Sequence, residues 1–151
     1  MEDAKKALVA CIDAIDKVVM EVMTEHWALV GAGDKAAESW ADKSALNLAH
    51  HKAGNSIQAK WYAVRWVGKK GARAMLRNNI RKLRGDDTYS MAELRKYAKD
   101  WEWPIVEKTE LKLAMLRKQA GFCAKALTSL RHAEMAEQKY KSYLGKEAAA
   151  K

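Results

Sequence analysis

The residues of this chain best suited to binding chemistry lie in one basic and aromatic stretch, KWYAVRWVGKKGARAMLRNNIRKLR, at residues 60–84. Nine of its positions are Lys or Arg, none is acidic, and three are Trp or Tyr. Lysine and arginine neutralise phosphates, and arginine also forms paired hydrogen bonds with phosphate or guanine. These residue types therefore point to a polyanion as partner, with nucleic acid as the natural one.

The net charge of +9 is unevenly distributed along the chain. Residues 1–42 carry −5, residues 43–85 carry +11 without a single acidic side chain, and residues 86–151 carry +3. The middle segment thus holds more positive charge than the whole protein. A localised excess of this kind is typical of a nucleic-acid-binding surface.

Spacing indicates which side chains of the stretch act together. Arg73, Arg77 and Arg81 recur every four residues, so they share a face on a helix or on a strand. Arg65 and Arg73 flank a predicted turn, and we expect them to contact a DNA groove, because a two-stranded β-ribbon fits the major groove. The candidate nucleic-acid-binding residues are Lys60, Tyr62, Arg65, Trp66, Lys69, Lys70, Arg73, Arg77, Arg81, Lys82 and Arg84.

The aromatic residues of the stretch have two expected roles. On a strand, Trp61 and Arg65 share one face while Tyr62 and Trp66 share the other. One face would pack on helices and the other would meet solvent or a ligand. Tryptophan in a small domain usually belongs to the core, so for Trp61 and Trp66, each taken alone, burial is the expectation.

Motifs for catalysis or metal binding are not found in the sequence. It contains no HExxH, CxxC, P-loop, GxGxxG or GxSxG motif. The adjacent His50 and His51 would point about 100° apart on a helix, which does not suit chelation. Cys11 and Cys123 are expected to be buried free thiols of a cytosolic protein. We therefore expect a cytoplasmic, non-enzymatic protein without catalytic residues, metal or cofactor, and without a membrane span, which needs ~20 apolar residues.

Helices are expected on both sides of the basic stretch. Apolar residues at steps of three and four predict an amphipathic helix over about residues 3–30, ended by GAGD at 31–34. Asp34 would cap a second, weaker helix over 35–51. Ser90 and Glu93 form a capping box for the next helix, and Pro104 predicts a kink or a fresh helix start. A heptad seam follows at Leu113, Leu116, Ala120, Cys123, Leu127 and Leu130.

Between these helices, residues 56–85 are predicted to form a small antiparallel hairpin, because SIQAKWYAVRWV favours a strand and GKKG a turn. Helical spacing of the apolar residues keeps a helix as the alternative. The expected fold is therefore a predominantly helical α+β domain over residues 1–151, with long N- and C-terminal helices packed together and the basic β-hairpin between them. Its parts are an acidic helical part (1–55), the hairpin (56–85) and a second helical part (86–151). An all-α bundle is the alternative.

The segments WYAVRWVGKKGAR, NNIRKLRG and TYSMAELRKYAKDWE together resemble the auxiliary mobilisation factors (MobI-type proteins) of conjugative plasmids and integrative conjugative elements. The resemblance covers about residues 57–110. It implies a small DNA-binding accessory protein of the relaxosome that recognises the origin of transfer and helps the relaxase act there. The expected partners are double-stranded DNA and a relaxase or another relaxosome protein, and the heptad seam or acidic N-terminal helix would support a homodimer.

Two other functions stay open from the residues alone. A small helical subunit of a ribonucleoprotein, such as a CRISPR effector complex, would have the same size and basicity. A protein-interaction adaptor would instead use the basic stretch to bind an acidic partner.

Overall fold

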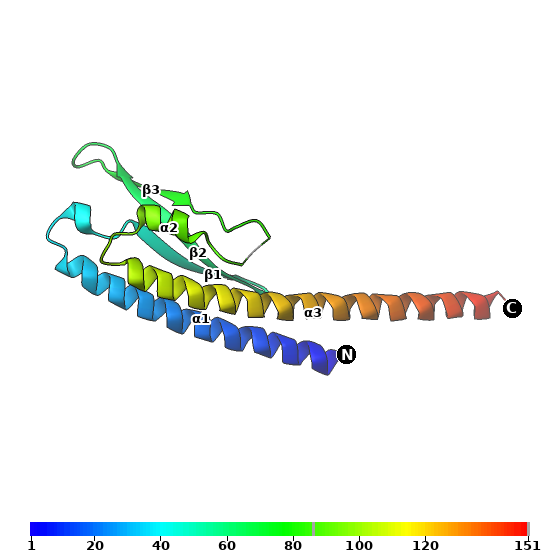
Figure 1. Cartoon of the computed structure of the whole chain (residues 1–151). Helices are drawn as coiled ribbons and strands as arrows, with labels where there is room; N and C mark the ends of the chain where they lie inside the picture. Colours follow the sequence, from blue (N-terminus) through cyan, green and yellow to red (C-terminus); the bar gives the residue numbers. More distant parts are fainter. Residues whose placement is uncertain (86, 151) are drawn as a thin grey trace.

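The computed structural model describes residues 1–85 and 87–150, and it shows a three-stranded sheet lying on a pair of long helices (Figure 1). The elements are α1 (Glu2–Ala36), the 3₁₀ turn η1 (Trp40–Asp42), β1 (Leu46–Ala53), β2 (Ser56–Val67), β3 (Ala74–Asn79), α2 (Met91–Tyr97) and α3 (Trp103–Ala149). The predicted class, a mostly helical α+β fold with N- and C-terminal helices packed together, is confirmed.

The two long helices pack side by side in opposite directions, and the C-terminal part of α3 extends past the N-terminus of α1 (Figure 1). Their contact is apolar, with Ile12 and Val19 of α1 and Leu113 and Leu116 of α3 buried. Most of the predicted heptad seam is therefore occupied by packing within the chain. Lys5 of α1 pairs with Glu134 of α3 near the end of the overlap.

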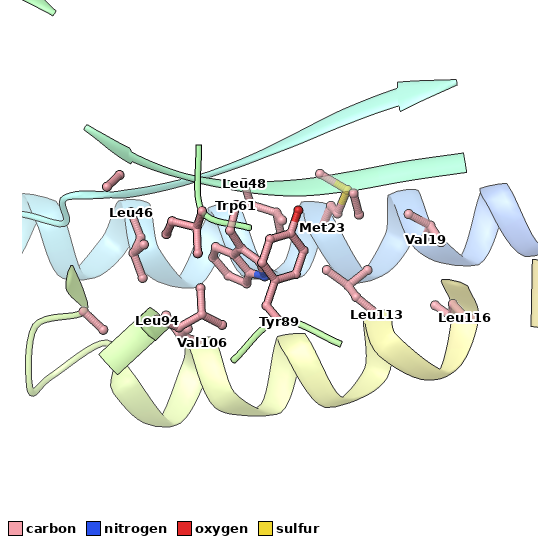
Figure 2. Close-up of a cluster of buried hydrophobic side chains, with 14 residues drawn as sticks. Val19, Met23, Leu46, Leu48, Trp61, Tyr89, Leu94, Val106, Leu113 and Leu116 are labelled. Atoms are coloured by element: carbon pink, nitrogen blue, oxygen red, sulfur yellow. The ribbon is translucent and has the colours of Figure 1, made fainter. Parts of the chain in front are cut away.

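The sheet is antiparallel with the order β1-β2-β3, so β2 is the central strand. Alternate residues in the middle of β2, namely Ala59, Trp61 and Ala63, are buried against the helices. Trp61 is fully buried at the centre of the core, where Figure 2 shows it close to Tyr89 and between the sheet and the helices. The expected burial is thus confirmed for Trp61.

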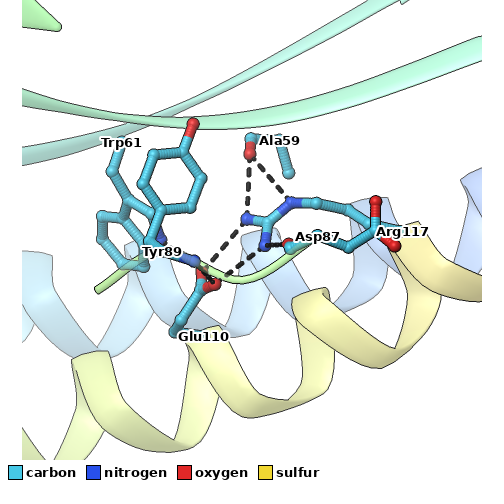
Figure 3. A network of polar contacts seen from close by, with 6 residues as sticks. All are labelled: Ala59, Trp61, Asp87, Tyr89, Glu110 and Arg117. Carbon is cyan, nitrogen blue, oxygen red and sulfur yellow. Dashed lines mark hydrogen bonds and ion pairs between the residues drawn. The ribbon is translucent and has the colours of Figure 1, made fainter. Parts of the chain in front are cut away.

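A buried ion pair attaches the central strand to α3 (Figure 3). The Arg117 guanidinium lies 2.8 Å from the Glu110 carboxylate and donates to the Ala59 carbonyl oxygen at 2.9 Å. Glu110 also accepts hydrogen bonds from Trp61 Nε1 at 2.7 Å and from the Tyr89 amide at 2.9 Å. Because every partner is buried, removing one of the two charges would leave the other unpaired, at a cost of about 3–5 kcal/mol.

The first helix is longer than predicted, because GAGD does not end it. α1 continues through these residues to Ala36. Gly33 lacks a Cβ, and an added Cβ there would overlap the Trp101 ring, so this glycine makes room for an indole against the helix. Asp34 does not cap a following helix, because its carboxylate accepts a hydrogen bond from the Ser44 amide at 2.7 Å.

The predicted second helix over residues 35–51 is wrong, because most of its second half forms β1. Leu46 and Leu48 are buried while their neighbours are not, which is the alternation of a half-buried strand. Trp27 of α1 holds the strand by donating from Nε1 to the Leu48 carbonyl oxygen at 3.0 Å. Gly54 supplies a positive φ of 56° in the two-residue turn between β1 and β2. The predicted hairpin is therefore part of a three-stranded sheet.

The predicted helix boundaries in the C-terminal half are largely confirmed. The Ser90 side chain accepts from the Glu93 amide at 3.3 Å and caps α2. The reciprocal half of the capping box is not formed, since the Glu93 carboxylate pairs with Lys96. α2 ends at Tyr97, and α3 starts afresh with Pro104 in its first turn.

The expected burial of the two thiols is wrong for Cys11. This residue is exposed on α1, because its neighbour Ile12 faces the core and successive helix residues point about 100° apart. Cys123 is half-buried, and both thiols are free.

Candidate nucleic-acid interface

One face of the sheet is turned away from α1 and α3, and we call it the outer face. On β2 its residues alternate with the buried Ala59, Trp61 and Ala63. The β2 residues of the outer face include Lys60, Tyr62, Val64 and Trp66. The strand prediction that Tyr62 and Trp66 lie opposite Trp61 is therefore confirmed.

The register with β3 adds a cation between the two aromatic side chains. Tyr62 pairs with Asn79, Val64 with Arg77, and Trp66 with Met75. Arg77 is exposed and lies, along the strands, between the levels of Tyr62 and Trp66. The expected burial of Trp66 is wrong, because strand alternation places this residue on the outer face, where it is 47% exposed.

The predicted arginines do not all share this face. Arg65 pairs with Leu76, and strand alternation puts both on the face opposite Arg77. Arg73 and Arg81 lie just outside β3, one on each side, and both are exposed. The structure therefore brings Arg77 together with Lys60, Tyr62 and Trp66, and it separates Arg65 from them.

The remaining predicted cations surround the outer face in loops. Lys69 and Lys70 are exposed in the turn between β2 and β3, where Gly68 and Gly71 adopt φ values of 103° and 91°. This turn projects away from the helices (Figure 1). Lys82 and Arg84 are exposed beyond β3, with Lys82 forming an isolated β-bridge to Tyr89.

The charges of these candidate residues are not neutralised by the rest of the described chain. None of the ion pairs formed among residues 1–85 and 87–150 includes a predicted binding cation. Other basic side chains of the middle segment are paired, since Lys52 contacts Asp13 at 2.5 Å and His50 contacts Asp16 at 2.7 Å. The ion pairs of the described residues thus involve other cations of the middle segment and not the candidate ones.

Sequence reasoning missed Trp40, which joins the site from the loop before β1. Its ring centroid lies 6.1 Å from that of Trp66, in an edge-to-face arrangement, and its side chain is 59% exposed. The Lys43 ammonium lies 4.9 Å from the Trp40 ring centroid. The helix predicted over residues 35–51 gives Trp40 no role beside the basic stretch. The sequence does carry one signal for this residue, because Trp40 lies three residues before Lys43 and belongs to no apolar stripe.

Groups suited to metal or acid–base chemistry are not gathered at this face. Among the described residues, no cluster of three or more His, Cys, Asp or Glu side chains could hold a metal ion. His26 is buried away from the outer face, with Nδ1 3.1 Å from the Thr109 hydroxyl oxygen, and burial lowers its pKa to about 4. No helix within the described part of the chain is long and apolar enough to cross a membrane.

The sequence of the chain matches the model of a known protein family. The family model described as MobI protein matches residues 17–131, about three quarters of the chain. The chain belongs to the MobI protein family. No curated protein and no solved structure matches it.

The MobI match extends the resemblance noted at residues 57–110 to both long helices. It includes most of α1, the whole sheet, α2 and α3 as far as residue 131. The projecting C-terminal part of α3 lies beyond the matched residues. Membership of the MobI family suggests an accessory role in the mobilisation machinery.

Proposed function

We propose that this MobI-family protein is a non-catalytic DNA-binding accessory factor that recognises the origin of transfer during conjugative DNA mobilisation. Family membership supports the mobilisation role. The DNA-binding part rests on one observation, the outer face with its surrounding cations, which has no acidic partner among the described residues.

The arrangement suits a duplex in two ways. Lys60 and Arg77 on the outer face and Lys69 and Lys70 in the projecting turn would neutralise phosphates, which supplies most of the sequence-independent affinity. The β2–β3 ribbon has the dimensions that the major groove accepts, so residues near the turn, including Arg73, would reach base edges. The relaxase is the proposed protein partner, placed at the same DNA site.

Charge reversal tests this function. A variant carrying Arg73→Glu, Arg77→Glu and Arg81→Glu is expected to bind an origin-of-transfer duplex about 100-fold or more weakly, because three cation–phosphate contacts become repulsive. Gel-shift or fluorescence anisotropy titrations at ~100 mM salt measure the change.

The matched control reverses three exposed lysines of α3, Lys118, Lys125 and Lys139, and changes the net charge by the same amount. We expect this control to retain most of the affinity. Equal losses in both variants would mean that net charge, and not the outer face, governs binding. Unchanged affinity in the arginine variant would reject the proposal, and tighter binding of RNA than of duplex DNA would favour a ribonucleoprotein subunit instead.

A further inference from the structure

The exposed indole pair formed by Trp40 and Trp66 is a feature that phosphate neutralisation does not explain. Trp40 is 59% exposed and Trp66 is 47% exposed, and Met75, the cross-strand partner of Trp66, is 41% exposed. The two rings contact each other edge to face across a centroid distance of 6.1 Å. Exposed aromatic side chains that touch one another form a contiguous apolar patch, and such patches mark interaction sites.

The pair is held in place by two separate elements. Trp66 lies near the end of the central strand β2, with paired backbone on its β3 side. Trp40 belongs to η1, which Trp101 braces by donating from Nε1 to the Asp42 carbonyl oxygen at 2.8 Å. The Ser39 hydroxyl donates to the Asp42 carboxylate at 2.6 Å. The two indoles are therefore preorganised, which lowers the entropy lost when a ligand stacks on them.

The surroundings favour an anionic ligand that carries flat rings. Lys43 lies over the Trp40 ring at 4.9 Å, and Lys69 and Lys70 follow Trp66 in the adjoining turn. Nucleotides combine phosphates with ring faces that stack on indoles. Bases inside a duplex are already stacked on their neighbours, so only an unpaired base has a face free for Trp40 or Trp66.

We propose that Trp40 and Trp66 form a stacking site for unpaired bases, so that the protein prefers DNA in which a duplex adjoins a single-stranded segment. This inference rests on the proposed function, because the outer face and the Lys69–Lys70 turn would hold the adjoining duplex. It places an opened strand at the Trp end of the sheet and double-stranded DNA along Lys60 and Arg77.

Binding to three probes tests the inference: a blunt duplex, the same duplex with an unpaired tail of about five nucleotides, and the tail sequence alone. One stacked base is expected to tighten binding to the tailed duplex by about 5- to 150-fold over the blunt duplex. Trp40→Ala and Trp66→Ala should each remove this preference, so that the tailed and blunt duplexes bind with equal affinity, and the chemical unfolding curves of the two variants show that they are folded.

Phe122→Ala is the matched control, since Phe122 is 60% exposed on α3 and has the Lys125 ammonium 5.7 Å from its ring centroid. It should keep the tail preference. Equal binding of tailed and blunt duplex by the wild type, or a tail preference that survives in both tryptophan variants, would overturn the stacking site while leaving the proposed function intact.

The failure of the proposed function gives a different pattern. Tryptophan-dependent binding of the single strand without any duplex binding would reject the duplex contact and keep the stacking site. Absence of binding to all three probes would reject both. If the tryptophan variants lost contact with a relaxase but bound every DNA probe normally, the pair would be a protein-docking surface and the stacking proposal would be wrong.

Discussion

Burial of His26 makes the stability of the fold depend on pH. Its ring lies edge-on to Trp61, with centroids 5.1 Å apart, and its Nδ1 faces the Thr109 hydroxyl. Burial lowers the pKa from 6.5 to about 4, so between these values the unfolded chain binds a proton that the folded chain does not. The His26 contribution to the free energy of unfolding is therefore intact above about pH 6.5. It falls by about 3 kcal/mol as the pH is lowered towards 4.

Urea unfolding of the wild type and of His26→Gln, from about pH 4 to 7.5, measures this contribution. Glutamine keeps a polar side chain near Thr109 but does not titrate, so the difference between the two curves isolates His26 from the other ionisable groups. We expect the wild-type advantage to shrink by about 3 kcal/mol between pH 7 and 4. Parallel curves would show that His26 is accessible to protons in the folded state.

Single residues show why the sequence predicts some side-chain roles and not others. Strand alternation correctly separates Trp61 from Trp66, but composition alone gives both the same expected burial. Glu110 and Arg117 look like surface charges on a helix, because neither has a feature that marks it as buried. Only the position of β2 over α3 brings the Ala59 carbonyl and the Trp61 indole to this pair. Contacts between distant segments are what sequence spacing cannot supply.

α1 continues through Gly31 and Gly33, and substitution of these glycines tests this. A methyl group at Gly31 would meet nothing, so Gly31→Ala should stabilise the fold by up to about 1 kcal/mol through higher helix propensity. A methyl group at Gly33 would overlap the Trp101 ring, so Gly33→Ala should destabilise it by about 1–3 kcal/mol. Chemical denaturation of both variants checks the pair. Small and equal effects would indicate that α1 ends before these glycines.

Elements with a strong local signal were predicted, and those defined by tertiary contacts were not. The β2–β3 hairpin, the Ser90 cap and the helix start at Pro104 follow from strand propensity, capping chemistry and the missing proline donor. β1 lacks such a signal, because LNLAHHKA is poor in β-branched and aromatic residues. It becomes a strand by pairing with β2 and through the hydrogen bond from Trp27.

Across the whole molecule, acidic groups of α1 pair with basic groups of β1 and α3. Asp13 and Asp16 of α1 pair with Lys52 and His50 of β1, on the edge strand away from β3. Glu25 of α1 lies 3.7 Å from Lys108 of α3. These ion pairs occupy acidic groups of α1, and none of those formed among the described residues involves a candidate cation of β2 or β3.

The two faces of the sheet should therefore contribute differently to the salt dependence of DNA binding. Each phosphate contact contributes about −0.9 to the slope of log K against log salt concentration. Lys60→Gln and Arg77→Gln, on the outer face, should each make the slope less steep by about 0.9. Arg65→Gln removes the same kind of charge from the same ribbon, but Arg65 lies on the opposite face and its loss should leave the slope unchanged. Titrations of one duplex at four or more salt concentrations give these slopes. If Arg65→Gln lowers the slope as much as Arg77→Gln, the DNA must contact both faces of the ribbon, as it would with the ribbon inserted edge-on in a groove.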